Sequence, residues 1–256
     1  MTGQCLLPTL QAVEITVVLH GSLADLARGS VHHVSAGARR SVKDLIESLG
    51  VPHTEMAAVT VDGATADLTA QVAGGEVVAV LPPEDPAARQ TGRWLLPTPP
   101  EPRRFVLDVH LGALARRLRL LGFDCWYRTA ASDRLLAEVA AGQQRILLSR
   151  DRQLLMRRVV THGYCPRTQD PDHQLSEVAG RYGLAARARP LTRCARCNGD
   201  LVRVPVEQVR EQVPPRTLRA IDRYARCQGC GQVYWPGSHL AAIDRILAGA
   251  GVGLSR

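Results

Sequence analysis

Two Cys-x-x-Cys pairs in the last third of the chain constrain its folding more than any other feature. Cys194 and Cys197 form the first pair, and Cys227 and Cys230 form the second. Each pair places two thiolates on a tight turn, and two such turns complete the tetrahedral shell that Zn²⁺ prefers. Because thiolates fill every position, none is left for water. The sequence therefore predicts a structural zinc site, whose binding energy is folding energy for this part of the chain.

The segment between the pairs, residues 198–226, is longer than the roughly 15–20 residues found in compact zinc modules. We interpret it as a helical excursion, which such a module tolerates. We place the protein in the cytoplasm, because its N-terminus lacks a secretion signal and no stretch approaches the roughly 20 apolar residues of a membrane span. In that compartment paired cysteines favour a metal over disulfides, with four free core cysteines as the alternative. Three cysteines remain, Cys5, Cys125 and Cys165, and we expect Cys125 and Cys165 to be small buried apolar residues.

The formal net charge of +8 is spread unevenly along the chain. Residues 1–82 hold more acidic than basic side chains, so all of the excess positive charge lies in residues 83–256. A basic region of this kind suits a nucleic-acid partner, because binding to a polyanion releases counterions. Nearly all of the cations are arginines, so genome composition is an alternative explanation.

Residues 13–82 read as a small domain of the β-grasp type. Apolar, β-branched residues predict a strand over 13–19, and Ser41 is a good N-cap for the helix that follows it. A strand pair joined by a turn at Asp62-Gly63 comes next. Strand, helix and strands in this order, in a segment of this size, predict a mixed α/β fold.

Residues 83–103 are rich in proline, which fixes φ and lacks an N–H, so we interpret them as a semi-rigid linker in which Trp94-Leu95-Leu96 docks on one domain. Strands and helices then alternate with short connections over residues 104–189. That alternation predicts an α/β domain with a parallel, doubly wound sheet. The zinc module and a closing helix, residues 190–256, complete the chain.

In the first helix of the α/β domain, leucines form one face, and three arginines lie largely elsewhere: Arg116, Arg117 and Arg119.

Three carboxylates follow predicted strands of this α/β domain. Asp108 comes directly after the first strand, Asp151 shortly after the third, and Asp133 opens the helix after the second. Ligands of open parallel sheets bind beyond the carboxyl ends of the strands, so we expect the three acids to converge there. Crowded carboxylates repel one another, and a hard cation such as Mg²⁺ or Mn²⁺ relieves that repulsion. The alternative is that each aspartate caps a helix.

Other polar residues complete the candidate site less directly. Asp172 is a candidate fourth acid, whereas Glu138 reads as a solvated residue and Asp124 starts a strand at the opposite end of the sheet. The arginines that we expect to neutralise phosphate are Arg116, Arg117, Arg150 and Arg152. Tyr234, Trp235 and His239 follow the second cysteine pair, and either stack on bases or pack the zinc module against the α/β domain.

These motifs, in this order, resemble the Mut7-C RNase family. The resemblance is carried by LDVHLGALARRLRLLGFDCWY, SDRLLAEVAAGQQRILLSRDRQLL, RCARCNGDL and CQGCGQVYWPGSH, and it covers residues 104–245. It implies a PIN-like nuclease fold with an attached zinc ribbon. It also implies that Asp108, Asp133 and Asp151 bind Mg²⁺ or Mn²⁺, with Asp172 at the fourth acidic position.

The N-terminal segment is similar to the ThiS/MoaD ubiquitin-like sulfur carriers, through SVKDLIESLGVPHTE, VTVDG and GGEVVAVLPP. Those carriers end in a free Gly-Gly tail, but here the chain runs on past Pro82-Pro83 and Gly74-Gly75 lies in a turn. Carrier chemistry is therefore not expected. We expect this domain to bind a partner or to support the fold.

Together, these observations predict a metal-dependent ribonuclease acting on single-stranded RNA, with water attacking the phosphorus in line. Two alternatives stay open. One is a non-catalytic RNA- or ribosome-binding protein whose acids only cap helices. The other is an adaptor that binds a protein partner through the β-grasp domain.

Overall fold

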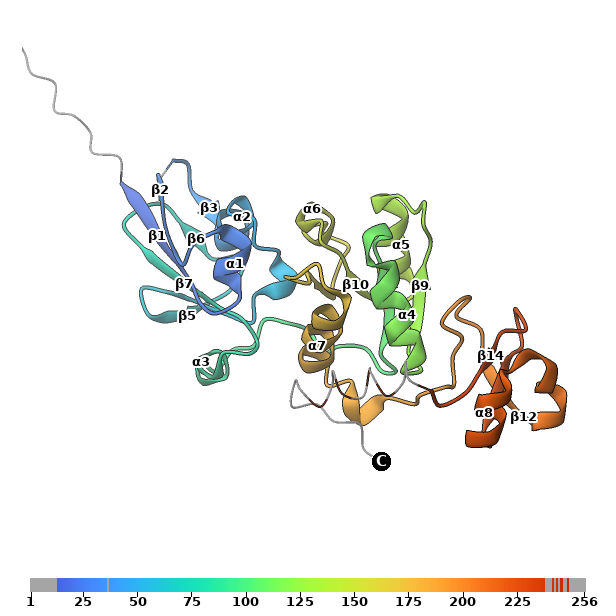
Figure 1. Ribbon diagram of the computed structural model, residues 1–256. Coiled ribbons are helices and arrows are strands. Elements are labelled where there is room, and N and C mark those ends of the chain that lie inside the picture. Colours follow the sequence, from blue (N-terminus) through green and yellow to red (C-terminus); the bar gives the residue numbers. More distant parts are fainter. Residues whose placement is uncertain are drawn as a thin grey trace, which may run out of the picture. The chain divides into compact units, whose positions relative to one another are not determined.

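The computed structural model describes residues 13–35 and 37–237 and the single positions 241, 243, 245 and 248. The chain divides into two compact units, Met1–Leu96 and Pro97–Arg256, which are coloured blue to teal and green to red in Figure 1. No helix among the described residues combines the length and the hydropathy needed to cross a bilayer.

The first unit is a five-stranded mixed sheet with a helix packed against it. Its strand order is β2-β1-β7-β4-β5, and the two central strands, β1 (Glu14–Leu19) and β7 (Val77–Leu81), run parallel. The predicted helix is α2 (Val42–Ser48), whose N-cap hydroxyl on Ser41 accepts a hydrogen bond from the backbone N–H of Asp44 at 3.1 Å. The other elements are α1 (Leu23–Ala27), β2 (Val31–Ser35), β3 (Arg40–Ser41), η1 (His53–Glu55), β4 (Ala58–Val61), β5 (Ala64–Ala66) and β6 (Gln71–Val72).

The predicted turn at Asp62-Gly63 joins β4 to β5, and both of its residues have positive φ, as a tight hairpin of twisted strands requires. Helix α1 and strand β2 were not predicted from the sequence. Both lie in a segment with little apolar periodicity, and β2 is an edge strand that alternates between exposed and half-buried positions.

The predicted linker, residues 83–103, is divided between the two units. Its first part forms α3 (Pro86–Gln90), buries Ala88 against the first sheet, and places the N–H of Leu95 2.8 Å from the carbonyl of Ala57. Its last residues belong to the second unit, where Arg103 donates to the carbonyls of Pro99 and Pro100. The boundary between the units therefore falls after Leu96, inside the segment that the prolines indicated as a linker.

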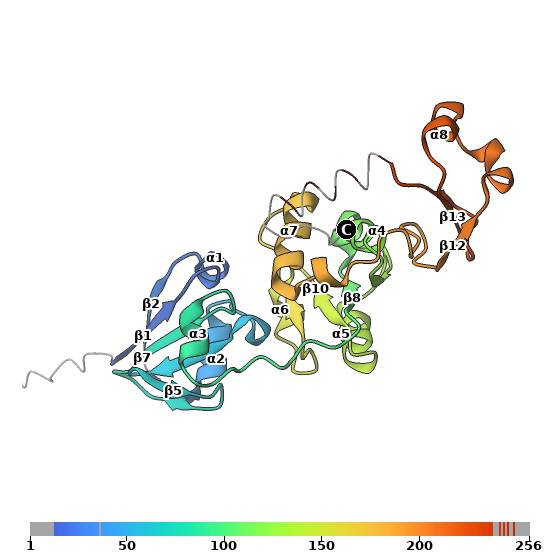
Figure 2. The ribbon, with the colours of Figure 1, turned by 90° about the horizontal axis from the view of Figure 1, so that it is seen from below.

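The second unit begins with a four-stranded parallel sheet in the order β11-β10-β8-β9. Its strands are β8 (Arg104–Leu107), β9 (Asp124–Tyr127), β10 (Ile146–Leu148) and β11 (Gly163–Tyr164). Figure 2 shows the sheet between two helical layers. The helices are α4 (Gly112–Leu120) and α7 (Pro171–Tyr182) on one face, and α5 (Asp133–Gly142) and α6 (Arg152–Leu155) on the other. The predicted doubly wound α/β fold is confirmed, with β11 as an unpredicted fourth strand.

Alternation along the strands explains the two helical layers. Phe105 and Leu107 of β8 share one buried cluster with Leu114 and Leu118 of α4. Val106, between the two strand residues, is also fully buried but lies outside that cluster, because successive side chains point to opposite faces. Burying each such side chain contributes about 1.5–3 kcal/mol, so both faces stabilise the sheet that carries the candidate site.

The last described part is a three-stranded antiparallel sheet around the cysteines, which we call the ribbon. Its strands are β12 (Leu201–Val204), β13 (Tyr224–Cys227) and β14 (Val233–Tyr234). As predicted, the insert is partly helical, with η4 (Val206–Gln208), η5 (Arg210–Gln212) and α8 (Pro215–Ala220). Of the predicted closing helix, only the four single positions are described, and they are helical.

Candidate functional site

The strand order reverses beside β8, which places a topological switch point between β8 and β10. The chain leaves β8 for β9 on one side and returns to β10 on the other. Open α/β sheets bind their ligands at the carboxyl ends of the strands at such a point. Asp108 follows β8 and Asp151 follows β10, so the fold places both of these predicted acids at this edge, which we call the carboxyl edge.

Asp108 is held firmly in place. Its side chain is 6% exposed, and its Oδ1 accepts a hydrogen bond from the N–H of Val109 at 2.6 Å. Its own N–H donates to the carbonyl of Leu148 at 3.0 Å, which ties the end of β8 to the end of β10. Asp108 also begins η2 (Val109–Leu111), so the predicted capping role and a buried carboxylate coexist at this position.

Ser149 connects the two acids. Its hydroxyl, fully buried, donates to Oδ2 of Asp108 at 2.7 Å and accepts from the N–H of Asp151 at 2.9 Å. Asp151 in turn caps α6 by accepting from the N–H of Gln153 at 2.8 Å, and its side chain is exposed. Ser149 was not among the residues predicted for the site. The available signal was a hydroxyl placed between a fully apolar strand and an aspartate.

Asp133 is the first residue of α5, but it is not the cap. Ser132 is the N-cap and accepts from the N–H of Leu135 at 3.3 Å. The Asp133 side chain is exposed, and no hydrogen bond or ion pair joins its carboxylate to another described residue. Capping therefore does not account for this acid.

The three acids do not form a closed cluster. Across residues 13–35 and 37–237, the four cysteines are the one group of three or more acidic, His or Cys side chains with ligand atoms within 4.8 Å of one another. Because like charges repel and Asp108 is turned towards Ser149, closer approach of these carboxylates requires a cation. The Mg²⁺ or Mn²⁺ site at Asp108, Asp133 and Asp151 stays a prediction.

Asp172 lies in the first turn of α7 and is paired with Arg117 of α4. The Nε of Arg117 lies 2.5 Å from Oδ1 of Asp172, with the Asp172 side chain 45% exposed. The cap of α7 is Asp170, whose pKa is held below its ordinary value by the backbone N–H groups of His173 and Asp172. Among the described residues, no hydrogen bond or ion pair joins Asp172 to Asp108 or Asp151, so its role as a fourth acid stays a prediction.

The predicted phosphate-binding arginines lie in two places. Arg150 and Arg152 flank Asp151 at the carboxyl edge, where Arg150 is exposed and Arg152 is half-buried. Arg116 is exposed in the middle of α4, beside the ion-paired Arg117. Two basic regions are therefore available to a phosphate chain.

The four cysteines form a site suited to a tetrahedral metal. The Sγ atoms of Cys194 and Cys230 lie 3.6 Å apart, and those of Cys197 and Cys227 lie 3.4 Å apart. Zn–S bonds of ~2.3 Å in a tetrahedron place the sulfurs about 3.8 Å apart, so the thiols need to move little to hold zinc. Burial opposes ionisation of the Cys194 thiol, but hydrogen bonds from Tyr234 and two backbone N–H groups outweigh it and lower its pKa to about 7. This donor set fits structural zinc.

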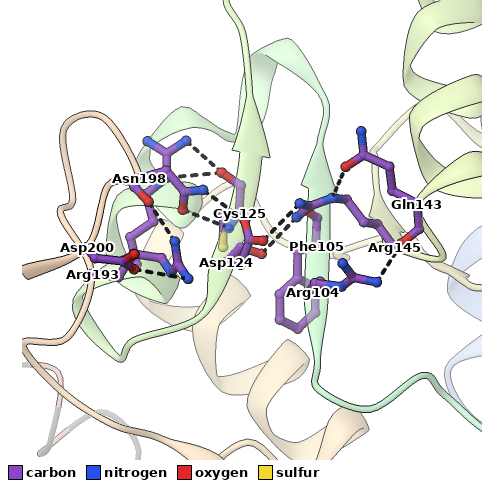
Figure 3. Close-up of polar contacts among 10 residues, drawn as sticks. Arg104, Phe105, Asp124, Cys125, Gln143, Arg145, Arg193, Asn198 and Asp200 are labelled. Atoms are coloured by element: carbon purple, nitrogen blue, oxygen red, sulfur yellow. Dashed lines mark hydrogen bonds and ion pairs between the residues drawn. The ribbon is translucent and has the colours of Figure 1, made fainter. Parts of the chain in front are cut away.

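The ribbon is attached to the opposite, amino edge of the sheet, as Figure 3 shows. Asn198, at the first cysteine pair, has a positive φ of 68° and reaches β9 with its side-chain amide. It donates to Oδ1 of Asp124 at 2.8 Å and accepts from the N–H of Cys125 at 2.9 Å. Oδ2 of Asp124 accepts from Arg145 at 2.9 Å. Asp124 is thus a structural acid, consistent with its exclusion from the predicted site.

Arg119 strengthens the same attachment and corrects one expectation. The sequence predicted that Arg119 would lie on the polar face of α4, away from the leucines. Instead, Arg119 is buried and only 5% exposed. Its guanidinium donates to the carbonyl of Cys125 at 2.7 Å and to those of Ala195 and Arg196 at 3.2 and 3.3 Å. These carbonyls replace water, which makes burial of the charge tolerable, although desolvation still lowers its pKa.

The aromatic residues after the second cysteine pair have packing roles. The Tyr234 hydroxyl contacts Cys194, and Trp235 packs against the ribbon core of Val209, Val213 and Val233. Both side chains remain partly exposed. His239 lies outside the described residues.

Comparison with known families gives two matches. A family model described as the Mut7-C RNAse domain matches residues 103–247, and one described as Mut7-C ubiquitin matches residues 12–88. The second match identifies the mixed sheet of the first unit as a ubiquitin-like domain. No curated protein matches the chain.

Proposed function

Because the chain belongs to the Mut7-C RNAse domain family, we propose that it is a metal-dependent ribonuclease that hydrolyses phosphodiester bonds of single-stranded RNA. In this proposal Asp108, Asp133 and Asp151 hold Mg²⁺ or Mn²⁺ at the carboxyl edge, and Asp172 is a candidate further acid. The zinc at the four cysteines has a structural role.

One observation carries the proposal. Asp108 and Asp151 follow the two strands at the switch point, and the Ser149 hydroxyl links them through hydrogen bonds of 2.7 and 2.9 Å. A buried carboxylate that faces only neutral hydrogen-bond donors is costly for stability, which is the pattern expected where function requires negative charge. Asp133 adds an exposed charge with no described partner.

The chain's residues have distinct roles in the proposed reaction. When bound, a divalent cation supplies Lewis-acid activation of water and neutralises charge on the phosphate. Ser149 orients Asp108, because its hydroxyl donates a hydrogen bond to Oδ2 of that carboxylate. The same hydroxyl accepts a hydrogen bond from the N–H of Asp151 and so holds the backbone of Asp151 in place. Arg150, exposed beside Asp151, is placed to attract the phosphate chain.

A second candidate function is non-catalytic RNA binding. It is favoured by the absence of a carboxylate cluster within 4.8 Å in the described part of the chain, and by the capping contacts of Asp108 and Asp151. The third, an adaptor role, follows from the ubiquitin-like domain, which offers a surface for a protein partner.

Cleavage of labelled single-stranded RNA by the full-length protein tests the first candidate. We expect cleavage with Mn²⁺ or Mg²⁺, and a fall of about 100-fold or more in rate for Asp108→Asn and Asp151→Asn, since electrostatic contributions to such reactions have this size. The matched control is Asp222→Asn, because its side chain is 95% exposed in the ribbon and far along the chain from both acids.

Metal-dependent cleavage that survives both substitutions would refute the assigned site. Retention of RNA without cleavage by the unsubstituted protein would favour the binding function. Loss of every partner protein on deletion of residues 13–82, with no RNA affinity in the intact chain, would favour the adaptor.

A further inference from the structure

A cleft of about 940 Å³ lies between α4 and the ribbon, within the second unit. We call it the ribbon cleft. One wall comes from α4 and includes Arg116 and Arg117, and the opposite wall comes from the ribbon and includes Arg216 of α8 and Trp235. Asp108, Asp133 and Asp151 do not line it, and the one candidate acid that does, Asp172, is paired with Arg117, so the cleft is distinct from the proposed metal site.

Among the described residues that line the cleft, the charge is positive and largely uncompensated. Arg117 is neutralised by Asp172, which also lines the cleft. Arg116 and Arg216 are exposed, and neither has an ion pair or hydrogen bond with another described residue. Two guanidinium groups on facing walls suit a ligand with repeated negative charge.

The rest of the lining is apolar and aromatic. Trp235 presents a half-buried indole, and Leu120 and Ile221 contribute apolar surface. Single-stranded nucleic acids bind where a basic groove follows the phosphates and aromatic rings stack on the bases. A protein ligand would use the apolar surface but would gain little from two uncompensated arginines, unless it were acidic.

We propose that the ribbon cleft binds a segment of single-stranded RNA that flanks the cleaved bond. Arg116 and Arg216 contact phosphates, and Trp235 stacks on a base. The choice of RNA as the occupant rests on the proposed function. The site itself rests on the charge and shape of the cleft.

The two walls are fixed to each other, which a binding cleft requires. Arg119 donates from α4 to the carbonyls of Ala195 and Arg196, and Asn198 bonds to the first residues of β9. The contacts at the amino edge hold the ribbon wall against α4, and zinc at the four cysteines would order that wall internally.

The cleft lies at a distance from the proposed cleavage site. Between Asp108 and Arg116 the chain forms η2 and the first turn of α4. At ~1.5–2 Å of rise per residue this separates them by on the order of 10 Å along the helix axis. A mononucleotide is then too short to occupy both sites, so affinity should rise with the first few nucleotides that are added to the RNA.

Fluorescence anisotropy with a labelled oligouridine and the full-length, zinc-loaded protein, without added Mg²⁺ or Mn²⁺, tests the proposal. We expect the double variant Arg116→Ala/Arg216→Ala to bind on the order of tenfold more weakly at 0.1 M salt, and its log–log salt slope to fall by about 1.4, since each phosphate contact on a single strand contributes ~0.7. The matched control is Arg203→Ala/Arg219→Ala, because both residues are exposed in the ribbon and neither lines the cleft.

Trp235 needs a pair of variants, because it also packs in the ribbon. Trp235→Phe keeps a ring and should retain most of the affinity. Trp235→Leu should lose about fivefold or more, as expected for the loss of one stacked base. A zinc content equal to that of the unsubstituted protein in both variants shows that the ribbon is still folded.

The outcomes separate this proposal from the proposed function. Weaker binding in the arginine and leucine variants supports the cleft even if no cleavage is found. If the cleft variants bind RNA as tightly as the unsubstituted protein, the cleft is not an RNA site, even if metal-dependent cleavage is found. An acidic protein would then be the remaining candidate ligand. Equal losses in both arginine pairs would also overturn the cleft as an RNA site, since they would indicate binding to the overall charge.

Discussion

The two edges of the parallel sheet hold carboxylates under opposite conditions. At the amino edge, Asp124 is paired with Arg145 and hydrogen-bonded by Asn198. At the carboxyl edge, Asp108 faces a serine hydroxyl and a backbone N–H. Asp133, at the start of α5, has no described partner. An aspartate whose charge is compensated thus attaches the ribbon to the sheet, whereas aspartates whose charge is not compensated are available for function.

The pKa of Asp124 reflects this difference. Burial alone would raise it, but the hydrogen bonds from Arg145 and Asn198 outweigh that effect and hold the pKa below its ordinary value. The amino edge therefore stabilises its charge within the protein. We therefore expect substitutions at the amino edge to lower stability, and substitutions at the carboxyl edge to lower activity.

The largest effect should come from the zinc ligands. Cys227→Ser should abolish zinc binding and unfold the ribbon, because zinc contributes on the order of 10 kcal/mol in small thiolate modules. Zinc content and amide hydrogen exchange would measure this, with loss of protection in residues 194–234 and none in the ubiquitin-like domain. Cys165→Ala, outside the site, should keep its zinc. A ribbon that stays protected without metal would show that its apolar core suffices.

The second-largest effect on stability should come from substitution of Arg119, which joins the ribbon to the amino edge. Arg119→Met leaves three backbone carbonyls without their donor and should cost about 3 kcal/mol. Chemical denaturation would measure the loss. Arg116→Met, three positions earlier and exposed, should change stability by less than about 0.5 kcal/mol. Equal costs would mean that burial of Arg119 adds no stability.

Asp124 should give a smaller and pH-dependent effect. A carboxyl with a lowered pKa in the folded state contributes stability above its unfolded pKa of ~3.9, and this contribution is lost as pH falls through the folded value. Asp124→Asn should therefore cost about 2 kcal/mol at neutral pH, and the difference from the unsubstituted protein should shrink below pH ~4. Denaturation at both pH values measures it. A difference independent of pH would contradict the ion pair.

The smallest effect on stability should come from Asp133, the first residue of α5. Asp133→Asn removes an exposed charge from the first turn of a helix and should cost no more than about 0.5 kcal/mol. If Asp133 binds the proposed cation, the same variant should lose most of the Mn²⁺-stimulated cleavage. Unchanged stability together with unchanged cleavage would remove Asp133 from the site.

Much of this arrangement was predictable because it depends on short-range patterns. The spacing of Cys194 and Cys197, the N-cap at Ser41 and the turn at Asp62-Gly63 each follow from a few neighbouring residues. The position of Asp108 after a strand follows from the alternation of elements and from the rule that parallel strands end at one edge.

The residues that were missed depend on contacts between distant parts of the chain. Arg119 appears polar in its own helix, and only the carbonyls of Ala195 and Arg196 explain its burial. Asn198 reaches Asp124 across a separation of 74 residues, and Ser149 reaches Asp108 across 41. Such partners leave no periodicity in the sequence.

By itself, the sequence determined which residues can bind metal, where strands and helices alternate, and that a ubiquitin-like domain precedes an α/β domain and a cysteine module. Only the tertiary structure decided which aspartates are compensated, which arginine is buried and which walls enclose the ribbon cleft. The reason is physical, since local patterns fix backbone conformation, whereas the environment of a charge depends on side chains that meet only after the chain has folded.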